Sequence, residues 1–446
     1  MPDRVSRVML IDLYELTMAA SYHHEGLVAT ATFDLFVREL PERRNFLIAC
    51  GLEQLLEYLE GFSFEEPEID YLRSLELFDE AFLTYLSSLR FTGEVWAVPE
   101  GEAVFAGEPL VRVTAPLIEA QLIETFVINC IAHQTMVASK AARVSIACEG
   151  KDFVDFSARR DHGFDAALYG ARAAFVGGAA ATSNVAAGMA FDIPLSGTMA
   201  HSYIMAHDNE EEAFRCFLRR FPDNAVLLID TFDVIEGARK AIKAAKELEP
   251  HGVRLRGVRI DSGDLALLTQ SVRELLDDAG LNDVQIFLSG DLDEYVIDEL
   301  LARGVPADAF GVGTQLGTSA DAPALGAVYK LVEDETGPKV KLSTGKATLP
   351  GRKQIYRLSR DGRYEKDVLA LADEEIADGA PLLQRIMADG QRLLARQTLP
   401  EIQERCRASL TRLPAPLRSL RRDEAGGYVI ERSEELERMR SRMSPE

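Results

Sequence analysis

Acidic and glycine-rich turns recur at one place in the pattern, directly after short apolar runs that are typical of strands. The turns are Asp230–Asp233, Asp261–Asp264, Ser289–Asp291 and Gly311–Thr314. In α/β barrels the active site is built from the loops at the carboxyl ends of the strands. Turns that were merely polar would scatter over both ends, so we expect these turns to form one functional surface, called the rim below.

Two turns of the rim have the composition of an anion cradle. Ser289-Gly290 and Gly311–Thr314 place small residues just before predicted helices, where backbone N–H groups can point at a phosphate. Glycines also make tight turns without a ligand, and either turn alone would be interpreted that way. The two follow neighbouring units where barrels commonly hold phosphate, so we predict phosphate contacts at Gly290, Gly313 and Thr314.

The aspartates of the rim suit a cation or a sugar. Converging carboxylates can hold Mg²⁺, which in turn carries a pyrophosphate, and they can equally bind ribose hydroxyls. Helix N-capping would explain Asp264 and Asp291. Asp230 and Asp261 come directly at strand ends, so we predict that these two have the functional role.

Basic side chains accompany these acids. Arg159-Arg160 follows the predicted strand Asp152–Phe156, and Arg259 lies within Val-Arg-Ile-Asp. A guanidinium can hold a carboxylate or phosphate through two parallel hydrogen bonds. Burying Arg259 among apolar neighbours would be costly without an anionic partner. Lys140 and Arg143 fit the surface of a helix, and we assign them no role.

One histidine stands apart from the others. His201 lies in the small-residue turn Gly197–Ser202, after the apolar run Ile193–Leu195, where an imidazole could meet a ligand. The other histidines lack metal-ligand spacing. A lone histidine is more often structural, so the residues alone leave both roles open for His201.

Composition excludes several classes of protein. The 446 residues carry 72 acidic and 49 basic side chains, a net charge of −23, which repels nucleic acid and anionic membranes. The odd number of cysteines and the lack of a Cys-x-x-Cys pair favour free thiols in a reducing compartment. No signal peptide or membrane-spanning apolar stretch is apparent, so we expect a cytoplasmic protein.

The chain divides into three regions by pattern. Residues 1–130 combine a strand at Ala31–Val37 with Leu- and Glu-rich helices and short strands, which predicts a small α+β domain. Residues 131–335 alternate strands and helices every 25–30 or so residues, as βα units do. Residues 336–446 read as a basic loop, charge-rich helices and a solvated tail, and we expect this segment to complete the N-terminal domain.

At this point the sequence resembles the nicotinate phosphoribosyltransferase family. The resemblance runs from about residue 8 to 357, and the order and spacing of its motifs make it specific. The motifs are Asp12–Ala19, Phe36–Glu39, Phe156–Arg160, Gly197–Ser202, Val258–Asp264, Phe310–Thr314 and Gly345–Tyr356.

The resemblance implies an irregular TIM-like α/β barrel with a second, strand-rich α+β domain, paired head to tail as a homodimer with shared active sites. It implies that nicotinate and phosphoribosyl pyrophosphate become nicotinate mononucleotide and pyrophosphate, with Mg²⁺ bound and ATP hydrolysed as a co-substrate. This reaction belongs to NAD salvage.

The motifs also imply roles for single side chains around the pyridine ring. Phe156 and Tyr14 would sandwich the ring, Tyr14 arriving from the neighbouring subunit; flat aromatic faces suit an electron-poor ring. Arg259 or Arg159 would meet the carboxylate, with Thr198 nearby.

The remaining implied roles concern phosphate, ribose and ATP. Arg38, also from the partner, would hold phosphate together with the Gly313-Thr314 turn, and Asp230 and Asp261 would hold ribose and Mg²⁺. His201 matches the histidine that ATP phosphorylates in the family, and a neutral imidazole is a competent nucleophile.

Substrate choice depends on one position. Relatives that use nicotinamide carry an acid where this chain has Ser183, and an uncharged site near arginine favours nicotinate. The alternatives are a nicotinamide- or quinolinate-using relative and a catalytically silent, ligand-sensing protein of the same fold. A metal-dependent hydrolase on a barrel would need closely spaced histidine ligands, which the sequence lacks.

Overall fold

The computed structural model describes residues 6–342, 348–421 and 427–443 of the chain. Part of the expected motif Gly345–Tyr356, including Lys346, lies outside these residues. The chain divides into two compact units: Met1–Ser139 together with Ala324–Glu446, and Lys140–Pro323. Each unit is described by itself.

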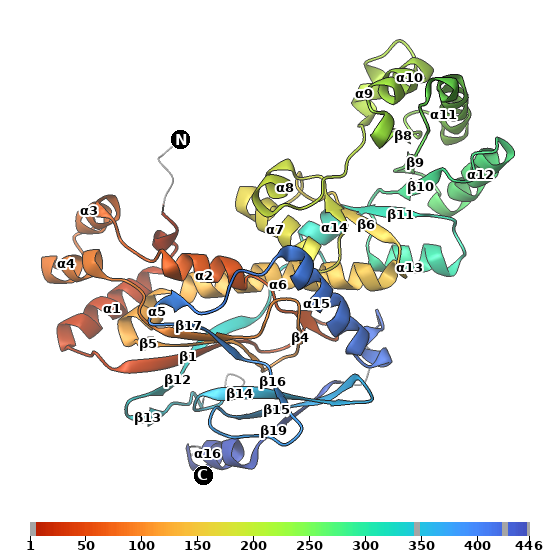
Figure 1. Ribbon diagram of the computed structural model, residues 1–446. Helices are drawn as coiled ribbons and strands as arrows, with labels where there is room; N and C mark the ends of the chain where they lie inside the picture. The colour runs from red at the N-terminus through yellow and green to blue at the C-terminus, as the bar shows by residue number, and fades with distance from the viewer. Residues whose placement is uncertain (1–5, 343–347, 422–426, 444–446) are drawn as a thin grey trace. The chain divides into compact units, whose positions relative to one another are not determined.

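Unit 2 (Lys140–Pro323) is built on a parallel sheet whose strands follow one another around a curve (Figure 1). The order is β7-β6-β11-β10-β9-β8. The strand that comes last in the sequence, β11, thus pairs with β6, one of the first two, and the sheet curls toward a barrel. Its strands are β6 (Asp152–Asp155), β7 (Ala181–Thr182), β8 (Val226–Leu228), β9 (Gly257–Ile260), β10 (Gln285–Leu288) and β11 (Ala309–Val312). The sequence pattern predicts strands at Asp152–Phe156, Ala225–Asp230, Val253–Ile260, Val284–Ser289 and Ala309–Val312. All five occur, and all but the last are shorter than expected.

The barrel has one interruption. Thr182 of β7 forms a parallel bridge with Leu195, but no strand pairing connects the Leu195 segment to β8 among the described residues. Asn224, just before β8, instead donates a side-chain hydrogen bond to the carbonyl of Gly197 at 2.8 Å. The gap between these segments makes the barrel irregular, as the fold class expected from the sequence requires.

Helices connect the strands of unit 2, as βα units predict. They are α7 (Phe164–Val176), α8 (Val185–Phe191), α9 (His201–Met205), α10 (Glu210–Arg220), α11 (Val234–Leu248), α12 (Leu265–Asp278), α13 (Glu294–Ala302) and α14 (Thr314–Gly317), with the short turns η2 (Pro222–Asn224) and η3 (Glu249–His251). Asp264 caps α12 by accepting from the N–H of Leu267. We expected Asp291 to cap α13, but the cap is Asp293, because Asp291 adopts a left-handed φ of 49° within the turn.

Unit 1 is rich in strands. Its largest sheet has the order β13-β12-β1-β5-β3-β17-β18, beside a four-stranded sheet β16-β14-β15-β19 and the pair β2-β4. The strands of the first half are β1 (Thr30–Val37), β2 (Leu47–Ile48), β3 (Glu94–Ala97), β4 (Ala103–Val104) and β5 (Pro109–Pro116). Those of the second half are β12 (Ala327–Asp334), β13 (Gly337–Pro338), β14 (Lys353–Arg360), β15 (Arg363–Leu371), β16 (Ala380–Pro381), β17 (Gln384–Ala388), β18 (Gln391–Arg392) and β19 (Val429–Arg432).

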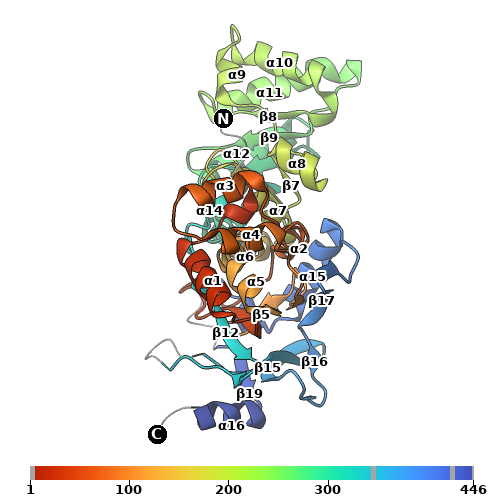
Figure 2. The same ribbon diagram turned by 90° about the vertical axis from the view of Figure 1, so that its left-hand side faces the viewer.

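Some helices of unit 1 pack against the large sheet, the four-stranded sheet lies on the other side of that sheet, and the C-terminal helix packs against β15 of the four-stranded sheet (Figure 2). The helices of unit 1 are η1 (Arg7–Met9), α1 (Leu13–Glu25), α2 (Leu52–Glu60), α3 (Glu66–Ser74), α4 (Glu80–Ser88), α5 (Leu117–Leu122), α15 (Leu399–Arg412), η4 (Ala415–Arg418) and α16 (Glu434–Met443), and α6 (Glu124–Ala147) runs from unit 1 into unit 2. The curled parallel sheet and the separate strand-rich sheets confirm the α/β fold class expected from the sequence.

The C-terminal segment differs from the sequence-based expectation. We expected helices after residue 340, but β14 to β18 occupy much of 353–392. The charges that suggested solvated helices are in part buried pairs, such as Arg357 with Asp367 at 2.6 Å. Strand β12, which we expected inside the 131–335 domain, pairs with β1.

Lys140 and Arg143 also differ from expectation. They are not on a helix surface: both are almost completely buried, and Lys140 contacts Glu294 at 2.5 Å and Asp321 at 3.0 Å. Arg143 contacts the other oxygen of Glu294 at 2.9 Å. The burial of these two residues could not be predicted from the sequence around α6, because their acidic partners lie some 150 positions or more further along the chain.

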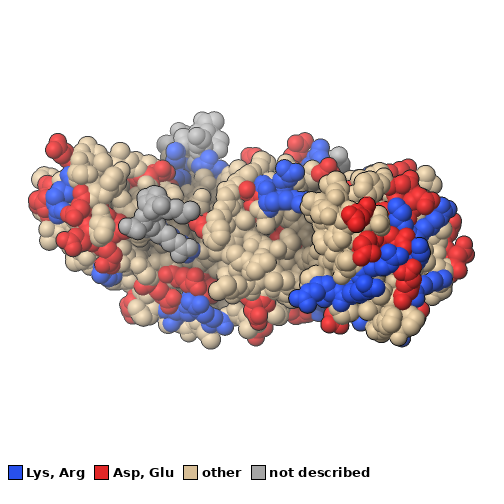
Figure 3. All heavy atoms as spheres, turned by 90° about the horizontal axis from the view of Figure 1, so that it is seen from above, with Lys and Arg blue, Asp and Glu red and all other residues tan. Residues whose placement is uncertain are grey.

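Two surface properties bear on partners. On the face shown in Figure 3, Lys and Arg side chains are interspersed with Asp and Glu. Opposite charges also pair directly, as Arg215 does with Glu247 at 2.7 Å. None of the described helices combines the length and apolar character needed to cross a membrane.

Candidate active site

Asp230 and Asp261 lie together at the carboxyl ends of β8 and β9. Oδ2 of Asp230 accepts hydrogen bonds from the N–H of Asp261 at 3.0 Å and from the hydroxyl of Ser262 at 2.6 Å. Oδ1 of Asp261 accepts from the hydroxyl of Ser289, after β10, at 2.5 Å. Three successive strand ends are thus joined by carboxylate–hydroxyl contacts, as the expected rim requires.

One oxygen of each of these carboxylates has no hydrogen-bond partner among the described residues. Oδ1 of Asp230 is buried and has no hydrogen-bond partner within the described residues. Within the described part of the chain, Oδ2 of Asp261 makes a long ion-pair contact, 4.0 Å from Nε2 of His201. Mg²⁺ is commonly bound by one or two carboxylates with water and phosphate oxygens completing its shell. The pair therefore fits Mg²⁺, although no group of three or more acidic, His or Cys ligands occurs in the described part of the chain.

Arg259 points into the same surface from β9. Its guanidinium donates to the hydroxyl of Thr198 at 3.1 Å and lies 4.0 Å from Asp261. Burial is the main cause that lowers the pKa of Arg259; Asp261 and Asp230 oppose this shift and Arg159 adds to it. Its Nε is buried without a hydrogen-bond partner among the described residues, so Arg259 retains capacity for an anion.

Phe156 supplies an aromatic face next to this arginine. The guanidinium carbon of Arg259 lies 5.8 Å from the centre of the Phe156 ring, and Phe287 packs on that ring at 5.7 Å. Gly311 has no room for a Cβ, which would lie 2.6 Å from the Phe156 ring. An aromatic platform beside a guanidinium is suited to a flat ring that carries a carboxylate.

His201 begins α9 at the interruption of the barrel. Its Nδ1 lies 3.1 Å from the hydroxyl of Thr231, and its Nε2 faces Asp261. The side chain is 40% exposed, so a ligand can reach it. The imidazole thus lies at the rim, beside Thr231 and Asp261.

Close packing and backbone conformation explain why some positions of the rim are glycines. Gly290 adopts a φ of +97°, and a Cβ there would overlap the carbonyl of Asp261. Gly313 lies beside the carbonyl of Phe156, and Thr314 begins α14. Close packing alone therefore explains Gly290 and Gly311, while Gly313 and the exposed Thr314 remain open to a ligand.

The remaining predicted residues come from other segments of the chain. Arg159 and Ser183 are exposed on turns that follow β6 and β7, and the N–H of Ser183 donates to the carbonyl of Asp155 at 2.9 Å. Tyr14 and Arg38 belong to unit 1: Tyr14 is 47% exposed on α1, and Arg38 is half-buried after β1. Burial and nearby acids, Glu124 first, raise the pKa of Tyr14, which keeps its phenol neutral.

Sequence reasoning missed a set of polar side chains behind Phe156. Asp155 accepts from the N–H of Ser157 at 2.9 Å and from the hydroxyl of Thr182 at 2.8 Å. Ser157 in turn donates to Asp161 at 3.0 Å. An acid at the last position of a buried strand, Asp155, was the available signal. The hydroxyls of Thr231 and Ser262 were missed because they do not differ from ordinary turn residues.

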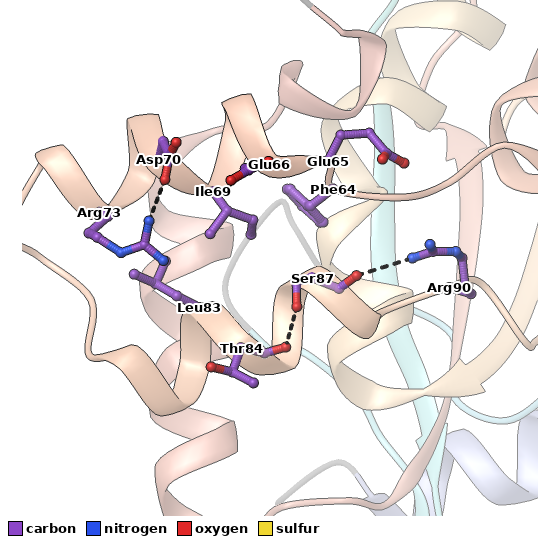
Figure 4. A pocket seen from close by; sticks show the side chains of 10 residues that line it. All are labelled: Phe64, Glu65, Glu66, Ile69, Asp70, Arg73, Leu83, Thr84, Ser87 and Arg90. Carbon is purple, nitrogen blue, oxygen red and sulfur yellow. Dashed lines mark hydrogen bonds and ion pairs between the residues drawn. The ribbon is translucent and has the colours of Figure 1, made fainter.

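A groove of about 340 Å³ lies elsewhere, between α3 and α4 of unit 1 (Figure 4). Its Arg73 is already paired with Asp70 at 2.5 Å and Glu80 at 2.8 Å. These side chains are also largely exposed, so their attraction for a ligand would be weak. We therefore place the site at the rim and not in this groove.

Comparison with known proteins shows which family this chain resembles. Residues 9–132 match the nicotinate phosphoribosyltransferase N-terminal domain model, and residues 152–345 match the model of the nicotinate phosphoribosyltransferase family. A nicotinate phosphoribosyltransferase of Mycobacterium tuberculosis is 46% identical over 413 residues, which cover 92% of this chain and 89% of the relative. One of Bacillus subtilis is 44% identical over 377 residues, covering 82% and 76%.

A solved structure extends the similarity to the whole fold. The crystal structure of human nicotinic acid phosphoribosyltransferase superimposes with a TM-score of 0.88 at 28% identity, covering 98% of this chain and 100% of that one. Both domain models, two relatives above 40% identity and a full-length structural match point to one family. The chain belongs to the nicotinate phosphoribosyltransferase family.

Proposed function

We propose that this chain transfers the phosphoribosyl group of phosphoribosyl pyrophosphate to nicotinate, giving nicotinate mononucleotide and pyrophosphate, in NAD salvage. The observation that carries the proposal is the joining of Asp230, Asp261 and Ser289 at successive strand ends, beside Arg259 and Phe156. Acceptors for ribose and a cation thus stand next to an aromatic face and a guanidinium.

The pyridine ring would lie on Phe156 with its carboxylate toward Arg259, Arg159 or both. The unpaired Nε of Arg259 supports a carboxylate ligand, and the neutral Ser183 favours nicotinate over nicotinamide because no acid repels the carboxylate there. Thr198 orients Arg259 by its 3.1 Å hydrogen bond. Tyr14 and Arg38, supplied by the partner subunit of a homodimer, would complete the ring and phosphate contacts.

The ribose and phosphates would occupy the rest of the rim. Asp230 and Asp261 would hold ribose hydroxyls and Mg²⁺, and Gly290, Gly313 and Thr314 would face the phosphates. When bound, Mg²⁺ would neutralise the charge of the departing pyrophosphate. The ring nitrogen attacks C1 of the ribose as the C1–O bond breaks, so positioning and charge stabilisation provide most of the rate.

His201 would connect the reaction to ATP. If Nδ1–H donates to Thr231, the lone pair is on Nε2, which faces Asp261. Nε2 would attack the terminal phosphorus of ATP, the P–O bond to ADP would break, and water would later hydrolyse the phosphohistidine. The added negative charge beside Asp261 would alter how the rim holds pyrophosphate and Mg²⁺.

The direct test is an assay of the purified chain with labelled nicotinate, phosphoribosyl pyrophosphate and Mg²⁺, with and without ATP. We expect nicotinate mononucleotide in both cases and more of it with ATP. Parallel reactions with nicotinamide and quinolinate test specificity. Comparable turnover of nicotinamide, or release of CO₂ from quinolinate, would contradict the substrate that we propose.

His201→Ala should abolish the stimulation by ATP while leaving slow, uncoupled transfer. The reason is that the imidazole carries the phosphoryl group and does not contact the bond that forms between nicotinate and ribose. ATP hydrolysis and mononucleotide formation are measured together, with His207→Ala, a nearby histidine bonded to the carbonyl of Tyr203, as the control. Wild-type ATP coupling in His201→Ala would refute the role.

A further inference from the structure

Asp161 is a carboxylate next to the site to which the proposed function gives no role. It follows Arg159-Arg160 directly, in the turn after Phe156. Its Oδ2 accepts a hydrogen bond from the hydroxyl of Ser157 at 3.0 Å. Its Oδ1 is shielded from solvent and has no hydrogen-bond partner in the described part of the chain. A stable fold rarely leaves a shielded carboxylate oxygen unbonded, so this one needs an explanation.

The unbonded oxygen lies against α14. A Cβ at Gly317 would overlap Oδ1 of Asp161 and Cβ of Ser157, so Asp161 occupies the space that any other residue at 317 would fill. Helix α14 starts at Thr314, directly after the turn that we assign to phosphate. Asp161 therefore contacts the element that carries the proposed phosphate turn.

The other end of the contact is the turn that carries the proposed carboxylate site. Ser157 accepts the N–H of Arg160 on its carbonyl at 2.7 Å and donates its own N–H to Asp155. Ser157 also follows Phe156, whose ring we assign to the pyridine. A displacement of Asp161 would therefore move Phe156, the Ser157–Arg160 turn and α14 together.

The charges around Asp161 make its ionised form unfavourable. Burial first, and then the charge of Asp155 at the end of β6, raise its pKa to about 6, while Ser157 and His162 lower it. Helix α14 carries no charged side chain. Helix α7, whose Gly170 faces the other carboxylate oxygen, carries Asp165 and Arg172.

The raised pKa of Asp161 makes the stability of the fold depend on pH. A carboxylate whose pKa is higher in the folded state favours folding below its unfolded pKa of about 3.9, and that contribution is lost as the pH rises through about 6. Above pH 6 the ionised Asp161 therefore destabilises the fold relative to a neutral group of the same shape. Side chains kept at such a cost concentrate at functional sites.

We propose that Asp161 is a positioning residue of the transfer reaction, holding the Ser157–Arg160 turn and helix α14 at a fixed separation. It thereby sets the distance between the bound pyridine and the bound phosphate, and it does not touch either substrate. The inference rests on the proposed function, because it requires the two substrates to bind at these two elements.

The test combines two substitutions with two measurements. Asp161→Ala removes the contact with Gly317, so kcat should fall by roughly tenfold to a hundredfold because small misplacements of reacting groups have effects of this size. The KM values for nicotinate and phosphoribosyl pyrophosphate should change far less, since the binding groups remain. Asp161→Asn keeps the shape and should retain most of the wild-type kcat.

The split between kcat and KM separates this role from a purely structural one, and thermal unfolding tests the charge of Asp161. Asp161→Asn should raise the Tm at pH 7.5 and leave it unchanged at pH 4, where the wild-type carboxyl is itself mostly protonated. Asp298→Asn, which removes an exposed carboxylate on α13, is the matched control and should alter neither kcat nor Tm.

Two results would overturn the proposal. Wild-type kcat in Asp161→Ala would show that the contact does not position the substrates. A lower Tm for Asp161→Asn at pH 7.5 would show that the charge stabilises the fold. If the wild-type chain itself made no mononucleotide, the proposed function would fail, whereas loss confined to Asp161→Ala supports both.

Discussion

Unit 2 contains two constellations of charged side chains that differ in how completely their charges are paired. Lys140, Arg143, Glu294 and Asp321 form a buried set with ion pairs of 2.5 to 3.0 Å and side chains at most 5% exposed. At the rim, Asp261 is 4.0 Å from both Arg259 and His201, and these side chains are 13% to 40% exposed.

Hydroxyl groups account for the difference. In the buried set the charges contact one another directly and little capacity remains for a ligand. At the rim, Thr198, Thr231, Ser262 and Ser289 stand between or beside the charged groups and satisfy one side of each. The other side stays available. The comparison teaches that neutral hydroxyl groups can keep neighbouring charges from pairing directly, which leaves those charges with capacity for a ligand.

The first way to break the comparison is Glu294→Ala. Removing the acid that joins Lys140 and Arg143 leaves buried cations without their partner, which costs about 3–5 kcal/mol of unfolding free energy. Urea unfolding measures the change. Glu299→Ala, on the exposed side of the same helix, should stay within about 0.5 kcal/mol of wild type. Equal stability of the two variants would show that the buried set does not stabilise the fold.

Asp261→Ala should have the second largest effect, and on activity instead of stability. Loss of a group that holds charge at the reacting centre lowers kcat by about a thousandfold. The matched control is Asp264→Ala in the same turn, which removes the cap of α12 and should cost about 1 kcal/mol of stability without comparable loss of transfer. Steady-state kinetics with thermal unfolding distinguish the two. Similar kcat values for both variants would remove Asp261 from the reaction.

Ser289→Ala sharpens the comparison with the smallest effect. Without the hydroxyl, Oδ1 of Asp261 is free to approach Arg259, and the rim would come to resemble the buried set. We expect kcat/KM for nicotinate to fall about tenfold, which corresponds to about 1.4 kcal/mol. An unchanged kcat/KM would mean that the hydroxyl does not keep the ion pair open.

Several features of the fold and site could be predicted from local pattern. The βα units of 152–312 were visible because buried parallel strands are short apolar runs and amphipathic helices follow them. The cap at Asp264 was predictable because it acts within one helical turn. The recurrence of acids and glycines at strand ends predicted that Asp230, Asp261 and Ser289 would meet, and the structure brings them together.

Long-range pairing explains what was missed. The strands of 353–392 carry charges whose partners are cross-strand neighbours or distant acids, so the pattern looked helical. Lys140 and Arg143 looked like surface residues because Glu294 and Asp321 are remote in the sequence. The hydroxyls of the rim and Asp161 give no local signal, since their roles depend on which strands become neighbours.

The sequence by itself determined the family, the alternation of strands and helices, and the side of the barrel on which acids and glycines gather. These features depend on residue types and their spacing, which can be read from neighbouring positions in the sequence. Only the tertiary structure decided that Asp261 lies between Arg259 and His201, that Lys140 is buried, and that Asp161 packs on Gly317. The physical reason is that a side chain's charge and exposure depend on distant neighbours, which the folded chain alone brings into contact.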